Sequence, residues 1–184
     1  MNKLRFVLLL ALFLQSYQAW SFSEPCQLVA KMAGNNEYQQ EPNRIASLNP
    51  PADIPKEWKL ELLENHGAWY VYQTDKPWFT KENCAPLTKK SLKDNSKVLF
   101  MPVLLNKKTG HNAVVTGTFI IKVYHKRDLP KVVKRYGFLP VSPLPNPESM
   151  IVEVRTTDSY DLLIQTLDRD KDVDLALPLL SEPR

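Results

Sequence analysis

The chain has 184 residues, 43% of them hydrophobic and 24% charged, and its 24 Lys and Arg against 20 Asp and Glu give a net charge of +4. Basic residues alternate with acidic ones, and no aromatic and basic stripe marks a predicted sheet face, so we expect no nucleic-acid partner. The three His residues are scattered and no Gly-x-Ser-x-Gly motif occurs. We therefore expect no metal, no cofactor and no enzymatic activity.

Residues 1–21 have the pattern of a signal peptide. A positively charged start precedes an apolar stretch, Phe6 to Leu14, that is too short to span a bilayer. Small residues predict cleavage after Ser21, with cleavage after Ala19 as the alternative. No later segment is apolar enough to cross a membrane. We expect the mature protein to be soluble, away from the membrane, and either periplasmic or secreted.

Cys26 and Cys84 are the only cysteines, and both lie in the mature chain. In an oxidising compartment an even pair predicts a disulfide. It would close a loop of about sixty residues and stabilise the fold by about 4 kcal/mol on the chain-entropy model. A redox pair or a metal site is the alternative, but no Cys-x-x-Cys spacing supports it.

Residues 22–110 form a predicted N-terminal extension that contains the disulfide. The polar, proline-bearing segment from Asn35 to Pro55 predicts irregular structure. Pro55 then opens a predicted helix to Leu63, with Trp58, Leu62 and Leu63 on its inner face and Gly67 as its stop.

A strand is predicted at Trp69 to Tyr72. Two apolar runs, Val98 to Leu105 and Ala113 to Val123, predict a hairpin, because a loop with Gly at its end, Asn106 to Gly110, joins them. Three tryptophans fall within about twenty residues in this region. We expect them to form a small aromatic core against the disulfide, with a ligand platform as the alternative.

The last third of the chain predicts strand, helix, strand, strand, helix, strand. The first strand covers Gly117 to Tyr124, and the first helix runs from Leu129 to Tyr136, with Asp128 as its N-cap and Gly137 as its end. The second strand, Phe138 to Leu144, contains two prolines and is therefore expected at a sheet edge.

The second part of this pattern begins with a strand from Met150 to Val154. Asp158 and Asp161 then have the spacing of a capping box for a helix to about Leu167. Its inner face is expected to carry Leu162, Leu163 and Leu167. The last strand is predicted at Val173 to Leu177. The expected fold class is therefore α+β.

This region resembles a known family. The stretch TFIIKVYHKRDLPKVVKRYGFLPVSPLPNPESMIVEV, followed by LLIQTLDRDKDVDLALP, is similar to the propeptide, or inhibitor-like, domain of subtilisin-family serine proteases. The last features of that pattern are Asp170, Asp172, Val173, Ala176 and Pro178. The resemblance implies a ferredoxin-like split βαβ domain over residues 111–178, with an extended tail at 179–184.

No protease domain follows in this sequence, so the resemblance is to the stand-alone external chaperones of secreted bacterial subtilisin- or kexin-like proteases. It implies that the protein, a monomer alone, binds such a protease 1:1, helps it to fold and inhibits it. The implied contacts are a sheet face, Ile121, Val123, Ile151, Val152 and Leu175, and a tail that enters the active-site cleft, Leu179, Leu180, Ser181, Glu182, Pro183 and Arg184. A protease inhibitor without a folding role, or a general periplasmic binding or adaptor protein, is the alternative.

Overall fold

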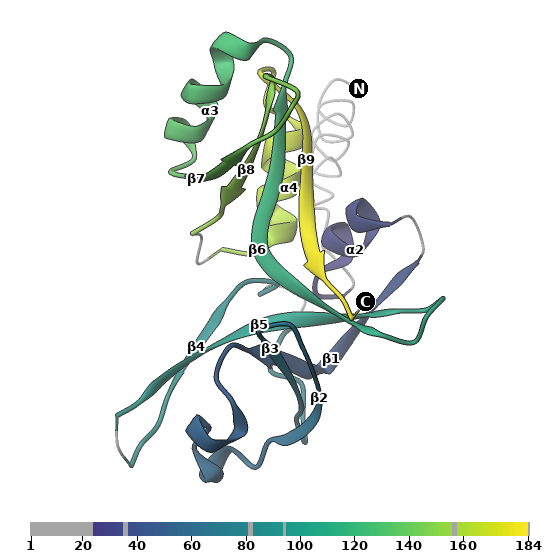
Figure 1. Cartoon of the computed structure of the whole chain (residues 1–184), viewed down its shortest axis with the longest axis vertical. Coiled ribbons are helices and arrows are strands. Elements are labelled where there is room, and N and C mark those ends of the chain that lie inside the picture. Colours follow the sequence, from purple (N-terminus) through teal and green to yellow (C-terminus); the bar gives the residue numbers. More distant parts are fainter. Residues whose placement is uncertain (1–23, 35–36, 81–82, 94, 156–157, 184) are drawn as a thin grey trace, which may run out of the picture.

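A computed structural model describes residues 24–34, 37–80, 83–93, 95–155 and 158–183. The predicted signal peptide, residues 1–21, lies outside them. The described chain is α+β, as predicted, with nine strands in one sheet and three α-helices (Figure 1). The main path of the sheet is β2-β3-β1-β5-β6-β8-β7, while β4 pairs with β5 and β9 pairs with β6. None of the described helices is long and apolar enough to cross a membrane.

The N-terminal half consists of one short helix and five strands. They are α2 (Gln27–Ala33), β1 (Tyr38–Ser47), β2 (Glu61–His66), β3 (Trp69–Gln73), β4 (Leu87–Lys90) and β5 (Lys97–Asn106). Two 3₁₀ turns, η1 (Pro51–Asp53) and η2 (Lys56–Trp58), lie between β1 and β2. The predicted strand at Trp69 and the predicted hairpin of β5 with the next strand are confirmed.

The segment predicted to be irregular contains instead a ten-residue strand, β1. Its central proline, Pro42, falls where the register with β5 shifts, between Gln40 and Ile45. A proline has no N–H to donate to a ladder, so within a sheet it is tolerated at such a bulge. The polar composition around Pro42 concealed a strand whose last residues, including Ile45 and Ala46, are fully buried.

The helix predicted from Pro55 to Leu63 is also wrong. The 3₁₀ turn η2 ends at Trp58, and the chain then forms β2, which pairs with β3. Leu62 and Leu63 were expected to face inward, but they are 43% and 42% exposed. Gly67 lies in the hairpin turn between β2 and β3 and does not end a helix.

The C-terminal half has the predicted order of elements. They are β6 (Asn112–Val123), η3 (Lys126–Asp128), α3 (Leu129–Arg135), β7 (Leu139–Pro143), β8 (Ser149–Glu153), α4 (Tyr160–Asp168) and β9 (Val173–Ser181). Their strands are ordered β9-β6-β8-β7 by antiparallel ladders, so β7 is at an edge as predicted. The helices α3 and α4 pack on one face of these strands (Figure 1).

The C-terminus of α3 follows the prediction. Gly137 has φ +65°, the left-handed conformation that favours glycine. Its N–H donates to the carbonyl of Lys134, and the N–H of Phe138 donates to the carbonyl of Val133 at 3.0 Å. These two bonds satisfy carbonyls at the helix end in the Schellman pattern.

The N-cap position of α3 is Asp128, as predicted, whereas the predicted N-cap of α4 is wrong. Asp128 makes no capping bond, and its carboxylate instead accepts from Lys131. At α4 the N-cap is Ser159, whose Oγ accepts from the backbone N–H of Asp161. Leu162 was expected to be inside but is 47% exposed. Ile164 and Leu167 are buried, and Leu163 packs partly against the core.

Asp161 caps a different helix from the one expected. Its buried carboxylate accepts from the backbone N–H of Gln27, Leu28 and Val29 at 3.0, 2.9 and 3.0 Å, which are the first residues of α2. A helix leaves its first N–H groups without partners inside the helix, and a carboxylate there also complements the helix dipole. Asp161 therefore attaches the start of the described chain to the C-terminal half.

The disulfide between Cys26 and Cys84 is present as predicted, and it lies beside this attachment. Both cysteines belong to the larger of two hydrophobic clusters, which also contains the inner face of the C-terminal strands. The backbone N–H of Tyr160 donates to the carbonyl of Cys84 at 2.6 Å. Disulfide, α2 and α4 thus meet at one junction between the halves.

The predicted aromatic core exists, but not against the disulfide. Trp58, Trp78 and Phe100 pack edge to face in the second hydrophobic cluster, with ring centroids 5.1 to 6.3 Å apart. The Nζ of Lys89 lies 3.5 Å from the centre of the Trp78 ring. Trp69 packs instead on the larger cluster, where the disulfide is.

Candidate functional site

The face of the C-terminal strands opposite α3 and α4 is an apolar stripe that the described helices leave uncovered. Ile120 of β6 is paired with Ile151 of β8 on one side and with Leu177 of β9 on the other, so the three side chains lie in one row. Leu175, opposite Lys122, extends the row and is 37% exposed. We call this surface, Ile120, Ile151, Leu175 and Leu177, the outer sheet face.

The outer sheet face differs from the face expected from the sequence. Ile151 and Leu175 lie on it, as the resemblance implied. Ile121, Val123 and Val152 are fully buried in the larger cluster, on the side of the helices. Successive side chains of a strand point to opposite faces. In β6 the buried face carries Phe119, Ile121 and Val123, whereas the outer face carries Thr118, Ile120 and Lys122.

Charged pairs border the outer sheet face. Lys122 forms an ion pair with Asp174 across β6 and β9, and Arg155 pairs with Glu153 at the end of β8. These pairs are partly solvent-exposed, so they contribute little to stability. They leave an apolar centre with a polar rim, the usual composition of a protein-binding surface.

The segment predicted as a free tail begins inside β9. Leu180 and Ser181 are paired with Val115 and Val114 of β6. The hydroxyl of Thr116 donates to the carbonyl of Leu179 at 2.9 Å. The final strand therefore runs past the C-terminal half and continues along the N-terminal half (Figure 1). Glu182 and Pro183 follow the strand, and Arg184 lies outside the described residues.

Residues from three other strands fasten the end of β9. The hydroxyl of Tyr38 donates to one carboxylate oxygen of Glu182, and the amide of Asn106 donates to the other at 3.2 Å. The Nε2 of His66 donates to the carbonyl of Ser181 at 3.1 Å. Burial and the hydrogen bond to Glu182 raise the pKa of Tyr38 to about 12, so its hydroxyl remains a donor at neutral pH.

Sequence reasoning missed these fastening residues. Tyr38 lies in the segment expected to be irregular, and Asn106 was placed in a hairpin loop. They are 144 and 76 residues from Glu182 along the chain. No local pattern links such distant positions; only the pairing of β9 with β6 brings them together. The one available signal was the position of Asn106, a polar residue that directly follows the strand predicted at Val98 to Leu105.

Charged and nucleophilic groups do not gather into a metal centre within the described residues. No group of three or more His, Cys, Asp or Glu there has the arrangement of a metal site.

The chain matches no protein-family model, no curated protein and no solved structure.

Proposed function

We propose that this protein is an exported chaperone that acts in trans on a subtilisin- or kexin-like serine protease and also inhibits it. The observation that carries the proposal is the outer sheet face, an apolar stripe on three strands, β6, β8 and β9, that α3 and α4 leave uncovered because they pack on the other face of the sheet. We interpret the order β9-β6-β8-β7 with these helices as the ferredoxin-like split βαβ domain that the sequence resemblance implies.

An uncovered apolar sheet face fits the surface of two parallel helices. In the subtilisin family, the propeptide sheet packs on two such helices of the catalytic domain. Folding of a protease with many non-local strand pairs is slow, because long loops must close, at a cost in chain entropy, before the stabilising strand contacts can form. A partner that binds the helix pair as it forms lowers that barrier. The same contact stabilises the folded protease by mass action.

Inhibition is assigned to the end of the chain, Leu179 to Arg184. The resemblance implies that this segment lies in the substrate groove as an added strand. Here Leu180 and Ser181 are paired with β6, and Glu182 is held by Tyr38 and Asn106. The proposal therefore includes an exchange, in which these internal contacts are given up and replaced by strand contacts with the protease.

An exported protein is consistent with the disulfide Cys26–Cys84, because disulfides persist in oxidising compartments. Such a protein would meet its protease after both have been exported. The partner is expected to be one protease molecule for each chaperone molecule.

The experiment measures refolding of a denatured subtilisin-like protease that lacks its own propeptide. The mature chain should raise the yield of active enzyme and then inhibit it. Ile151→Asp and Leu177→Asp should each abolish most of the effect on yield, because a charge would be buried in the interface. Leu92→Asp is the matched control, since Leu92 is 96% exposed and lies in the loop between β4 and β5.

Equal yields with and without the mature chain would refute the chaperone role. If inhibition persisted in that case, the protein would be an inhibitor only. If the Leu92→Asp variant lost as much of the gain in refolding yield as the Ile151→Asp and Leu177→Asp variants, the gain would not depend on the outer sheet face. Far-ultraviolet circular dichroism of each variant establishes that it is folded.

A further inference from the structure

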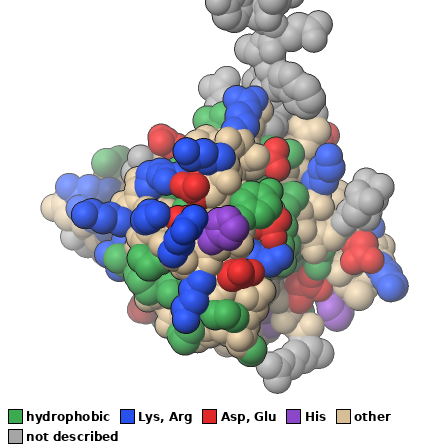
Figure 2. Space-filling model, turned by 90° about the horizontal axis from the view of Figure 1, so that it is seen from above, with side chains coloured by type: hydrophobic (Ala, Val, Ile, Leu, Met, Phe, Trp, Pro, Cys, Tyr) green, Lys and Arg blue, Asp and Glu red, His purple; other side chains and the backbone are tan. Residues whose placement is uncertain are grey.

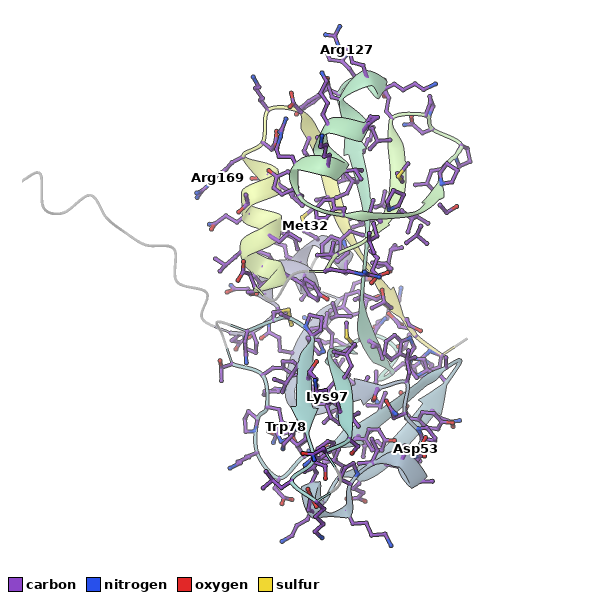
Figure 3. All side chains as sticks on the ribbon, turned by 90° about the vertical axis from the view of Figure 1, so that its left-hand side faces the viewer. Met32, Asp53, Trp78, Lys97, Arg127 and Arg169 are labelled. Carbon is purple, nitrogen blue, oxygen red and sulfur yellow. A yellow bond between two sulfur atoms is a disulfide. The ribbon has the colours of Figure 1, made fainter. Side chains whose placement is uncertain are left out.

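A second surface lies at the far end of the C-terminal half, where β6 leads into α3 and α4 leads into β9. A hollow of about 500 Å³ opens there, and its lining includes the basic side chains His125, Arg127, Lys131 and Lys171. Figure 2 looks onto this end and shows Lys and Arg side chains gathered on it. Figure 3 shows Arg127 at its tip, pointing away from the fold.

Two acidic residues, Asp128 and Asp172, also line the hollow, and each forms an ion pair. Asp128 accepts from Lys131 at 2.7 Å. Asp170 and Asp172 both accept from the guanidinium of Arg135. Arg135 offsets only one of the two carboxylates that it contacts. The charged residues that line the hollow, Arg127, Lys131 and Lys171 against Asp128 and Asp172, still leave a small positive excess.

Three cations at the same end form no ion pair within 4 Å with a described carboxylate, although the pKa of Asp128 is lowered by Lys131 and also by the charge of Arg127. Arg127 and Lys171 line the hollow, and Lys126 precedes Arg127 in the exposed turn η3. Adjacent unpaired cations repel one another, and a concave wall concentrates their field. Arrangements of this kind raise the local concentration of anionic groups and accelerate association with them.

The shape and chemistry of the hollow favour an acidic peptide segment over a lipid surface. The cations surround a depression, whereas a bilayer is contacted by a flat or convex surface with apolar side chains that insert. A guanidinium offers a planar pair of donors that matches a carboxylate. Tyr124, which is 55% exposed, lies on the wall of the hollow and provides an apolar surface for the stem of a Glu side chain.

We propose that this hollow binds an acidic segment of a partner protein, a run of consecutive Glu or Asp residues, with Arg127 and Lys171 as its charge partners. The site is separate from the outer sheet face and from the end of β9. It does not depend on the partner being a protease, so it can be tested without one.

The test uses a fluorescein-labelled hexaglutamate peptide and the mature chain. Fluorescence anisotropy should report binding at about 20 mM salt that weakens strongly by about 150 mM salt, because exposed charges are screened over about 8 Å at the higher concentration. The double variant Arg127→Glu/Lys171→Glu should bind at least about tenfold more weakly. Arg127→Lys/Lys171→Arg keeps the charge and should retain most of the affinity.

The matched control is Lys107→Glu/Lys108→Glu in the exposed loop between β5 and β6, which changes the net charge by the same amount. It should bind the peptide within about twofold of the unchanged chain. Equal weakening in the control would overturn the proposal, because net charge alone would then explain binding. Absence of peptide binding, or binding to phosphatidylglycerol vesicles without binding to the peptide, would also overturn it.

Discussion

The carboxylate of Asp161 in α4 accepts a hydrogen bond from the backbone N–H of Val29 in α2, across a sequence separation of 132 residues. A side chain of the C-terminal half thus caps a helix at the beginning of the described chain. Burial raises the pKa of this carboxyl, while the N–H groups of α2 favour its charged form. The position of α2 therefore depends on a group outside its own sequence neighbourhood.

Replacing Asp161 with Asn should destabilise the protein by about 2 kcal/mol, because the amide can accept through one oxygen only and its NH₂ would face backbone donors. Urea unfolding measures the free energy change. Hydrogen exchange should show faster opening of Gln27 to Ala33. Asp168→Asn, an exposed position on the same helix, is the control and should change stability by less than about 0.5 kcal/mol. Equal effects of the two substitutions would contradict a capping role.

Removing the disulfide should lower stability by a larger amount. Cys26→Ser/Cys84→Ser opens a loop of 58 residues in sequence separation, which the chain-entropy model equates with about 4 kcal/mol. Thermal unfolding should show a lower Tm for this variant. Reduction of the unchanged chain should give a similar loss. If the reduced chain had the same Tm as the disulfide-bonded chain, the disulfide would not constrain the unfolded state as the chain-entropy model assumes.

How much of this fold follows from the sequence depends on how local its signals are. In the C-terminal half, alternating β-branched residues and the glycine end of α3 fixed the order and type of each element. In the N-terminal half, Pro42 concealed β1, and the spacing of Leu62 and Leu63 suggested a helix where β2 forms. β1 pairs with β3 and β5, which follow much later in the chain, and no local pattern records such pairing. β2 is an edge strand that pairs only with β3, the next strand in the chain.

The candidate site shows the same division. Of the five residues that the resemblance placed on a protease-binding sheet face, Ile151 and Leu175 lie on the outer sheet face, whereas Ile121, Val123 and Val152 are buried on the side of the helices. In β6 the polar residues Thr118 and Lys122 share the outer side with Ile120, so the alternation of polar and apolar residues already marked the side of Ile121 and Val123 as the buried one. The capping of α2 by Asp161 was missed because Asp161 has the spacing of a cap for its own helix.

Loss of the Tyr38–Glu182 hydrogen bond should loosen the end of β9 without unfolding the protein. Tyr38→Phe and Glu182→Gln should each accelerate hydrogen exchange in the segment from Leu177 to Pro183. In a double-mutant cycle their coupling should be about 1 kcal/mol, as expected for a partly exposed bond to a charged group. Additive effects, with no coupling, would show that the two side chains do not act together.

Stability should fall in acid partly through Asp170. Burial opposes its ionisation, but the N–H of Asp172, the guanidinium of Arg135 and the hydroxyl of Tyr136 together hold the pKa of Asp170 below 3.8. Its unfolded form binds a proton first as the pH falls. This group therefore stabilises the fold above about pH 3.8, and that contribution is lost as the pH drops through the lower, folded value.

Replacing Arg135 with Gln tests this dependence. Without the guanidinium, the folded pKa of Asp170 should rise toward its unfolded value, so the loss of stability below about pH 3.8 should become smaller in the variant. The measurement is the free energy of unfolding in urea between about pH 2 and about pH 7. Superimposable pH profiles for the variant and the unchanged chain would contradict the assignment of the acid dependence to this pair.

The strand β6 belongs to both halves at once. Its first residues pair with β5, its later residues pair with β8, and β9 follows it on both sides of a register shift near Gly117. Gly117 has φ +77°, and a Cβ there would meet the hydroxyl of Tyr160 at 2.8 Å, so the bend requires glycine. A boundary between residues 110 and 111 falls inside the β5–β6 hairpin. Separating the chain at that boundary would leave each fragment with an open strand edge, because β5 and β9 both pair with β6.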